Sequence, residues 1–213
     1  MLLNSEIILK ILGRMIQVIS EKYKYLDKLD SEIGDGEHGS NMHRGFLAIK
    51  NDIEKLKKLN PGELLLKAGE ILVFNIGGAS GPLYGTAFIE AGKVIRGKEE
   101  VSEDEIIEMF DSSLKGIKNR GKTELGDKTM IDTLEPAVNK LKTSYLAGSD
   151  WETALLEMKE SAREGMNSTK DMIAVRGRAS YLGQRAKGYV DPGAASMYLL
   201  LEAIVDTIVK KGE

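Results

Sequence analysis

The sequence predicts an all-α protein, a single domain of eight helices that covers residues 1–213. Apolar residues recur three or four positions apart along nearly the whole chain, as in amphipathic helices. No segment alternates apolar and polar residues over a useful length, as a half-buried strand would. The chain also has no internal repeat, low-complexity tract or obvious linker that would mark a domain boundary.

Four helices are predicted in the first half of the chain. The first ends near Asp30, and the second covers about residues 40–57. The third starts at 60–63, where an asparagine N-cap is followed by proline and by a glutamate that completes a capping box. The run 71–74 has the composition of a short strand, but it continues the pattern of this third helix. The fourth helix covers about 82–95. The apolar stripe of the first helix comprises Ile8, Leu12, Met15 and Ile19.

The second half of the chain predicts four more helices. Serine three residues before glutamate forms a capping box, and this pattern predicts helix starts after Ser102 and Ser149. Between them, a helix is predicted from just after Lys128 to about Leu146. The last helix begins at Asp191, an N-cap followed by proline, and is apolar on most of its circumference. We therefore expect this last helix at the centre of the fold.

The composition excludes several classes of function. The net charge is −3, and the 30 lysines and arginines are spread along the chain, which argues against a nucleic-acid surface. The chain has no cysteine, so disulfides and thiolate chemistry are excluded. The apolar stretch 2–19 is interrupted by Glu6, Lys10 and Arg14, so it is neither a signal peptide nor a membrane span. A cytoplasmic location is the expectation.

The segment 30–37 concentrates acidic side chains around two glycines. On a continuous helix Asp35 would point about 140° away from Asp30, so a turn is needed before these carboxylates can approach one ion. Carboxylates in a tight turn suit a hard divalent cation such as magnesium or calcium. An EF-hand loop is excluded, because neither possible register places glycine and glutamate at the required positions. A solvated acidic loop remains the alternative.

Four glycine-bearing loops lie between the predicted helices, at 34–39, 77–82, 121–129 and 176–193. Several of them open a helix, and a helix N-terminus offers free N–H groups and a positive dipole end to a phosphate. Taken singly, each loop is more often an ordinary turn and cap than a ligand site. The segment 116–123 matches the Walker A pattern, but no strand precedes it and no helix follows it directly, so we reject it as a P-loop.

Four blocks of sequence together resemble one known family. They read LDSEIGDGEHGSNM from Leu29, GGASGPLYG from Gly77, GDKTMIDT from Gly126, and GRASYLG from Gly177 followed by DPGA from Asp191. In this order they resemble the ADP-binding subunits of dihydroxyacetone kinase, of the type that depends on the phosphotransferase system. The resemblance covers nearly the whole chain. It implies an eight-helix antiparallel barrel with a nucleotide site at one end.

The resemblance also implies the residues of that site. Two magnesium ions would be held by Asp30, Asp35 and Glu37, although the family usually has aspartate in place of Glu37. No residue would act as a covalent nucleophile, since phosphoryl transfer depends on positioning and charge neutralisation. The residues expected to contact ADP or ATP are His38, Gly39, Ser40, Asn41, Ala79, Ser80, Leu83, Gly121, Thr129, Met130, Arg178, Asp191, Pro192 and Gly193.

By the same resemblance, the chain holds ADP, is recharged by a phosphohistidine carrier protein, and passes the γ-phosphoryl to dihydroxyacetone on a separate substrate-binding subunit. Two alternatives stay open. The chain is the nucleotide half of an ATP-dependent kinase for another small acceptor, or it reports its nucleotide state to a transcription regulator. The sequence leaves the oligomeric state open, a homodimer included.

Overall fold

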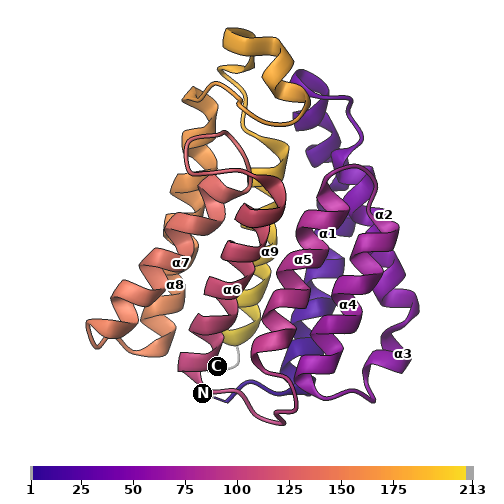
Figure 1. Cartoon of the computed structure of the whole chain (residues 1–213), viewed down its shortest axis with the longest axis vertical. Coiled ribbons are helices and arrows are strands. Elements are labelled where there is room, and N and C mark those ends of the chain that lie inside the picture. Colours follow the sequence, from indigo (N-terminus) through magenta and orange to yellow (C-terminus); the bar gives the residue numbers. More distant parts are fainter. Residues whose placement is uncertain (1, 210–213) are drawn as a thin grey trace.

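The structure, a computed structural model, describes residues 2–209 and is built from helices (Figure 1). Residues 1 and 210–213 of the predicted domain lie outside the described part. The α-helices are α1 (Ser5–Ile33), α2 (His38–Asn51), α3 (Ile53–Leu56), α4 (Pro61–Asn75), α5 (Ser80–Val94), α6 (Glu103–Gly121), α7 (Ile131–Leu146), α8 (Trp151–Ser168) and α9 (Pro192–Val209). Two 3₁₀ segments, η1 (Thr169–Asp171) and η2 (Arg178–Ala186), lie between α8 and α9.

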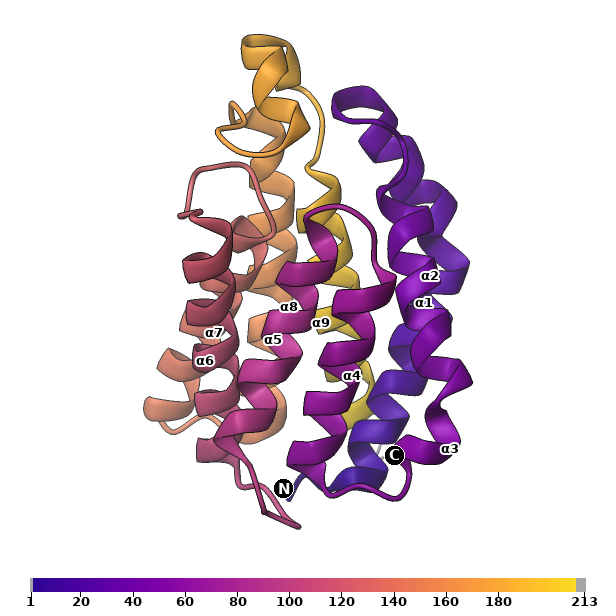
Figure 2. The same ribbon diagram turned by 45° about the vertical axis from the view of Figure 1, so that its right-hand side comes forward.

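Eight of these helices form a closed ring, and α3 is a single turn. Each long helix packs against the next one along the chain, and α9 packs against α1, which closes the barrel. Successive helices run in opposite directions, as Figures 1 and 2 show. The prediction of an all-α barrel is confirmed. Residues 71–74 belong to α4, as their helical pattern predicted.

Several predicted helix starts are formed by the expected hydrogen bonds. The Asn60 side chain accepts the N–H of Glu63 at 3.0 Å, with Pro61 as the first helical residue. At Ser102 the reciprocal capping box is complete, since Glu105 also accepts the Ser102 N–H. Asp191 accepts the N–H of Ala194 at 2.7 Å at the start of α9.

Three predicted boundaries were wrong. The second predicted helix is interrupted at Asp52, where α2 ends and the short α3 begins. The cap of α8 is Asp150 rather than Ser149, because a carboxylate accepts both the N–H and the hydroxyl of Thr153. Helix α5 begins at Ser80, two residues before Pro82, because proline is tolerated in the first turn of a helix.

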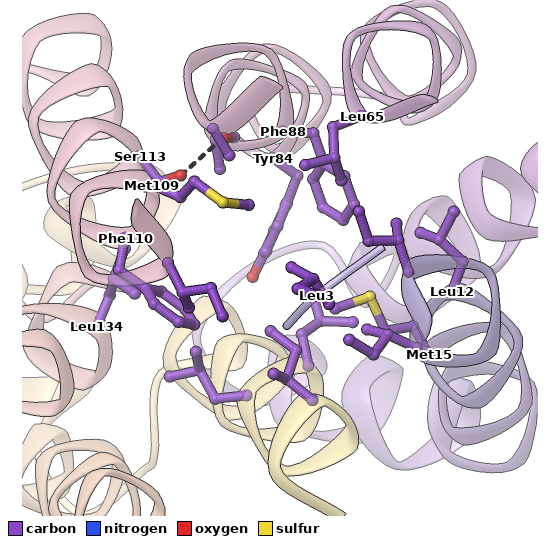
Figure 3. A pocket seen from close by; sticks show the side chains of 18 of the residues that line it. Leu3, Leu12, Met15, Leu65, Tyr84, Phe88, Met109, Phe110, Ser113 and Leu134 are labelled. Atoms are coloured by element: carbon purple, nitrogen blue, oxygen red, sulfur yellow. Dashed lines mark hydrogen bonds between the residues drawn. The ribbon is translucent and has the colours of Figure 1, made fainter. Parts of the chain in front are cut away.

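Helix α9 supplies much of the core. It is long and apolar enough by composition to cross a membrane, but 61% of that stretch is buried inside the protein. It packs against α1, α7 and α8 as one of the eight helices of the ring. The expectation of a central position was wrong, because its wide apolar surface is shared between these neighbours and the barrel interior. The barrel interior keeps an apolar cavity of about 140 Å³ between α1, α5, α6 and α9 (Figure 3).

Glycines allow neighbouring helices to approach closely. A Cβ on Gly165 of α8 would lie 2.1 Å from the carbonyl oxygen of Asp132 in α7. A Cβ on Gly39 of α2 would lie 1.9 Å from the carbonyl oxygen of Tyr23 in α1. Both obstacles are backbone atoms inside helices, so a larger residue would force the helices apart.

Replacing Gly165 by alanine should therefore lower the free energy of unfolding by about 2–3 kcal/mol, the cost of overpacking a rigid contact. Urea unfolding followed by circular dichroism measures this change. Gly13→Ala is the matched control, since no atom lies within 4 Å of the added Cβ. It should stabilise the exposed middle of α1 by about 0.5–1 kcal/mol. Equal effects of the two substitutions would contradict the packing argument.

Candidate functional site

The barrel order gathers four chain reversals at one end. Helices α1, α4, α6 and α8 end there, and α2, α5, α7 and α9 begin there. The connecting segments are the four glycine-bearing loops predicted from the sequence. Together they enclose a cleft of about 760 Å³. Four helix N-termini therefore surround one cavity. Some of their first-turn N–H groups are already paired within the protein, such as that of His38 with Asp30 and that of Ile131 with the Thr129 hydroxyl.

The acidic wall of the cleft is built around Asp30, in the last turn of α1. Its carboxylate accepts the N–H groups of Glu37 at 3.0 Å and His38 at 3.2 Å, so it shapes the turn into α2. A Cβ on Gly34 would lie 2.1 Å from Asp30 Oδ1, and glycine is required there. Burial, followed by the neighbouring Asp35 carboxyl, raises the pKa of Asp30. Two adjacent acidic groups in this position favour a cation between them.

The donor set of this wall fits a hard divalent cation. Asp30, Asp35 and Glu37 all line the cleft and offer carboxylate oxygens. Among residues 2–209, no three acidic or imidazole side chains are already gathered as metal ligands. Asp35 is instead paired with the guanidinium of Arg178 at 2.8 Å. The positively charged side chain of Arg178 thus occupies part of the space in which Asp35 would bind a metal.

The segment that carries Arg178 forms a cover over the acidic wall. Residues Ala179 and Ala186 of η2 pack on Ile33 at the end of α1, in a small apolar cluster separate from the main core. This contact fixes η2 beside the cleft and brings Arg178 to Asp35. Arg176, two residues earlier, is paired with Asp127 at 3.6 Å.

The opposite wall begins at the N-terminus of α5. Gly78 has a positive φ of 65°, and after this turn the chain enters the helix at Ser80. The hydroxyl of Ser80 lies 3.3 Å from His38 Nδ1, so this helix start faces the start of α2. Burial lowers the pKa of His38 to about 4, and the imidazole is therefore neutral at pH 7.

The third wall is the loop between α6 and α7, which a buried carboxylate organises. Asp132 is 1% exposed and accepts the N–H groups of Gly126 and Thr129. The side chain of Lys128 is turned inward from a backbone φ of 62°. Its ammonium donates to the carbonyls of Thr169 and Tyr189, and so connects this loop to the segment before α9.

The start of α9 completes the cleft. Burial raises the pKa of Asp191 to about 7, although Lys128 nearby acts in the opposite direction. The backbone N–H of Asp191 donates to the hydroxyl of Thr169 at 3.0 Å. A Cβ on Gly193 would lie 3.0 Å from the Asp191 carboxylate and 3.8 Å from Met130, which shows how closely the two loops approach.

The structure brings most of the predicted site residues to this one cleft. Those that line it are Asp30, Asp35, Glu37, His38, Asn41, Ala79, Ser80, Leu83, Gly121, Thr129, Met130, Arg178, Asp191, Pro192 and Gly193. Gly39 and Ser40 do not line it. Gly39 packs against the backbone of Tyr23, and both the N–H and the hydroxyl of Ser40 donate to Asp27 on α1. The ligand contacts of all these residues remain proposals.

Sequence reasoning missed three cationic residues of the cleft, namely Arg120, Lys128 and Arg176. Each lies inside or next to a glycine-bearing loop that the sequence had marked. Basic residues at loop positions were a usable signal, since a site with several carboxylates and an anionic ligand needs cations for balance.

The imidazole of His38 makes stability depend on pH. The pKa of His38 is lower in the folded protein than the ordinary 6.5, so the unfolded chain binds this proton more readily. Stability is therefore complete above pH 6.5 and is lost as the pH falls toward 4. Between pH 7 and pH 4 the protein should lose about 2–3 kcal/mol more unfolding free energy than His38→Asn does. Parallel pH curves for the two proteins in urea unfolding would contradict this assignment.

The DAK2 domain family matches residues 32–206. PEP-dependent dihydroxyacetone kinase 2, ADP-binding subunit DhaL, of Listeria innocua serovar 6a is 39% identical over 202 residues, covering 94% of this chain and 93% of the relative. The PEP-dependent dihydroxyacetone kinase, ADP-binding subunit DhaL, of Escherichia coli K12 is 38% identical over 193 residues. This match covers 91% of this chain and 92% of the relative.

A crystal structure of the dihydroxyacetone kinase of C. freundii in complex with AMP-PNP and Mg²⁺ has a TM-score of 0.71 and 25% identity. It covers 95% of this chain, whereas this chain spans only 33% of that protein. The barrel fold and the match over most of the sequence lead to the same conclusion, that this chain belongs to the DAK2 domain family.

Proposed function

We propose that this chain is the nucleotide-binding subunit of a dihydroxyacetone kinase. It holds ADP or ATP with two magnesium ions and passes the γ-phosphoryl to dihydroxyacetone on a separate substrate-binding subunit. A phosphohistidine carrier protein of the phosphotransferase system recharges the ADP. Relatives of similar length are named ADP-binding subunits of PEP-dependent kinases. The observation that carries the proposal is the convergence of three carboxylates and the α5 N-terminus on one cleft.

The phosphate end of the nucleotide would lie between α5 and the acidic wall. At the start of α5 the N–H groups of Ser80 and Gly81 have no helical partner and suit phosphate oxygens. Asp30, Asp35 and Glu37 would hold magnesium, which neutralises charge on the phosphates when bound. Glu37 has a longer side chain than aspartate and reaches the same region from one more methylene away. Three carboxylates suit two ions better than one, because a nucleotide-bound magnesium usually keeps one or two.

The nucleoside end would lie between the α6–α7 loop and the start of α9. A Cβ on Gly121 would come within 3.2 Å of the Leu83 side chain, so these two residues form one close apolar surface. Met130 and Gly193 form the facing contact, with Asp191 beside them. An apolar slot with a few polar groups is typical of sites for a planar base.

Phosphoryl transfer at this site requires no covalent nucleophile on the protein. The chain would contribute positioning and charge, from the helix N-termini, the carboxylates and the cationic side chains. The acceptor would be brought by another subunit, since the described residues are used entirely by the barrel and its loops. A phosphocarrier and a substrate subunit as partners imply a cytoplasmic location.

Nucleotide retention tests the proposal directly. Protein purified in magnesium should carry one ADP per chain through gel filtration, and EDTA should release it, because the carboxylates hold the phosphates only through the ions. Mass spectrometry and absorbance of the released nucleotide measure the ratio. Protein that is folded, nucleotide-free and unable to bind ADP with magnesium in calorimetry would overturn the proposal.

The rate of ADP release separates the proposed donor from the main alternative. Release over hours fits a bound nucleotide that is recharged in place by a carrier protein. Exchange within seconds fits a kinase that takes free ATP for dihydroxyacetone or another small acceptor. Turnover in a mixture with the substrate subunit and the phosphocarrier distinguishes both from a subunit that only reports its nucleotide state to a transcription regulator.

Arg178→Ala should change metal and nucleotide binding in opposite directions. ADP affinity in magnesium should fall about 10- to 100-fold, since a charged donor near the phosphates is lost. Magnesium alone should bind more tightly, because Asp35 no longer has its guanidinium partner. Isothermal titration with each ligand measures both effects. Arg163→Ala, which removes an exposed arginine paired with Glu160 on α8, is the control and should change neither. A fall in both affinities would show that Arg178 does not compete with the metal.

A further inference from the structure

A chain of hydrogen-bonded side chains connects the barrel interior to the cleft through His38. The Tyr84 hydroxyl lies 2.7 Å from Ser196 Oγ and 3.1 Å from the carbonyl oxygen of Gly193. Ser196 Oγ in turn lies 2.7 Å from His38 Nε2. On the other side of the ring, Nδ1 faces the hydroxyl of Ser80. Four side chains from α2, α5 and α9 thus form one continuous path.

Apart from Ser196 and the Gly193 carbonyl, the apolar surroundings of Tyr84 offer its hydroxyl no hydrogen-bond partner. Its ring lies among apolar side chains and lines the interior cavity (Figure 3). Of the residues that line this cavity, only Tyr84 and Ser113 carry polar side-chain atoms, and Ser113 donates to the carbonyl of Ala87 instead. Tyr84 and Ser196 are 1% and 0% exposed, so water cannot replace the contacts they make with each other.

The number of protons on Ser196 decides the direction of the hydrogen bonds. Its oxygen has one proton and two lone pairs, and it has four neighbours within hydrogen-bond distance. Two of them, the carbonyls of Pro192 and Gly193 at 3.0 and 3.1 Å, only accept. If Ser196 donates to these carbonyls, as serines in helices commonly do, both 2.7 Å contacts must be donated to it. Tyr84 then donates its single hydroxyl proton to Ser196 at 2.7 Å, with the Gly193 carbonyl at 3.1 Å as the longer second acceptor, and His38 donates from Nε2.

We propose that Tyr84 and Ser196 are positioning residues for His38. Their hydrogen bonds hold its ring as the Nε2–H tautomer and leave Nδ1 to accept the hydroxyl proton of Ser80. The Ser80 oxygen then turns its lone pairs to the cleft, and the α5 backbone N–H groups are left to contact an anionic ligand. The inference rests on the proposed function only in identifying that ligand as the phosphates of a nucleotide.

The tautomer is measured first, on nucleotide-free protein. The full chain labelled with ¹⁵N-histidine has only two imidazoles to assign, those of His38 and His43, and His43→Gln identifies the second. At pH 8 His38 should show protonated Nε2 and bare Nδ1, with a slowly exchanging Nε2–H proton. Exchange of this proton should be about 3- to 10-fold faster in Tyr84→Phe, and the slow signal should be absent in Ser196→Ala, because each loses a hydrogen-bond partner. Protonated Nδ1 in the unmodified protein would overturn the proposal.

Nucleotide release provides the second measurement. In magnesium, ADP should dissociate about 3-fold faster from Tyr84→Phe and about 10-fold faster from Ser196→Ala, as expected for one or two weakened hydrogen bonds. Matched controls are Ser113→Ala and Tyr198→Phe, which remove a cavity hydroxyl and a tyrosine hydroxyl that donates to Glu202 on α9. Both should keep the ADP rate and the His38 spectrum of the unmodified protein.

The outcomes separate the two proposals. If the two controls accelerate ADP release as much as Tyr84→Phe and Ser196→Ala do, the effect comes from a general loss of barrel stability. The positioning role is then wrong. If the unmodified protein does not bind ADP, the proposed function fails. The spectrum of His38 still decides whether Tyr84 and Ser196 hold its ring as the Nε2–H tautomer. Circular dichroism and thermal unfolding establish that each variant remains folded before either measurement.

Discussion

The closed up-and-down order of the helices is the constraint on which the rest of this structure depends. Each helix begins at the end of the barrel where the previous one finished, so alternate connections meet at the same end. Four loops must therefore share a small area, because each is either short or bonded back to its helices. The N-termini of α2, α5, α7 and α9 come together with them. The cleft is a consequence of this order and does not require a separate domain.

Carboxyl groups at the chain reversals then give the loops their shapes. Asp30, Asp132 and Asp191 each accept backbone N–H groups at a point where the chain turns at the cleft. An ionised acceptor makes a stronger hydrogen bond than a neutral one, so a single side chain can hold an irregular turn. Burial raises the pKa of Asp30 and Asp191, and it makes the cleft favourable for cations. Arg178 and Lys128 meet part of this demand within the chain itself.

The sequence predicted the helices well where a local signal was sufficient. Asn60 and Ser102 cap their helices through atoms only three residues away, so the pattern contains the whole interaction. The prediction was wrong where two local signals competed. Asp150 caps α8 in place of its neighbour Ser149, and the second predicted helix is interrupted at Asp52 although its apolar pattern continues. At the start of α8, Ser149 and Asp150 both offered a capping side chain, and the backbone geometry selected Asp150.

For the site, the sequence by itself determined which loops carry unusual residues, because glycines and clustered carboxylates are visible without a fold. Only the tertiary structure decided which side chains face the cleft. Ser40 turns to Asp27 on α1, whereas Arg120 and Lys128 line the cleft from positions that the pattern did not distinguish. The pairing of His38 with Ser196 joins residues 158 positions apart. Contacts of this kind depend on how α2 and α9 lie in the closed barrel, and periodicity in one helix contains no information about the orientation of another.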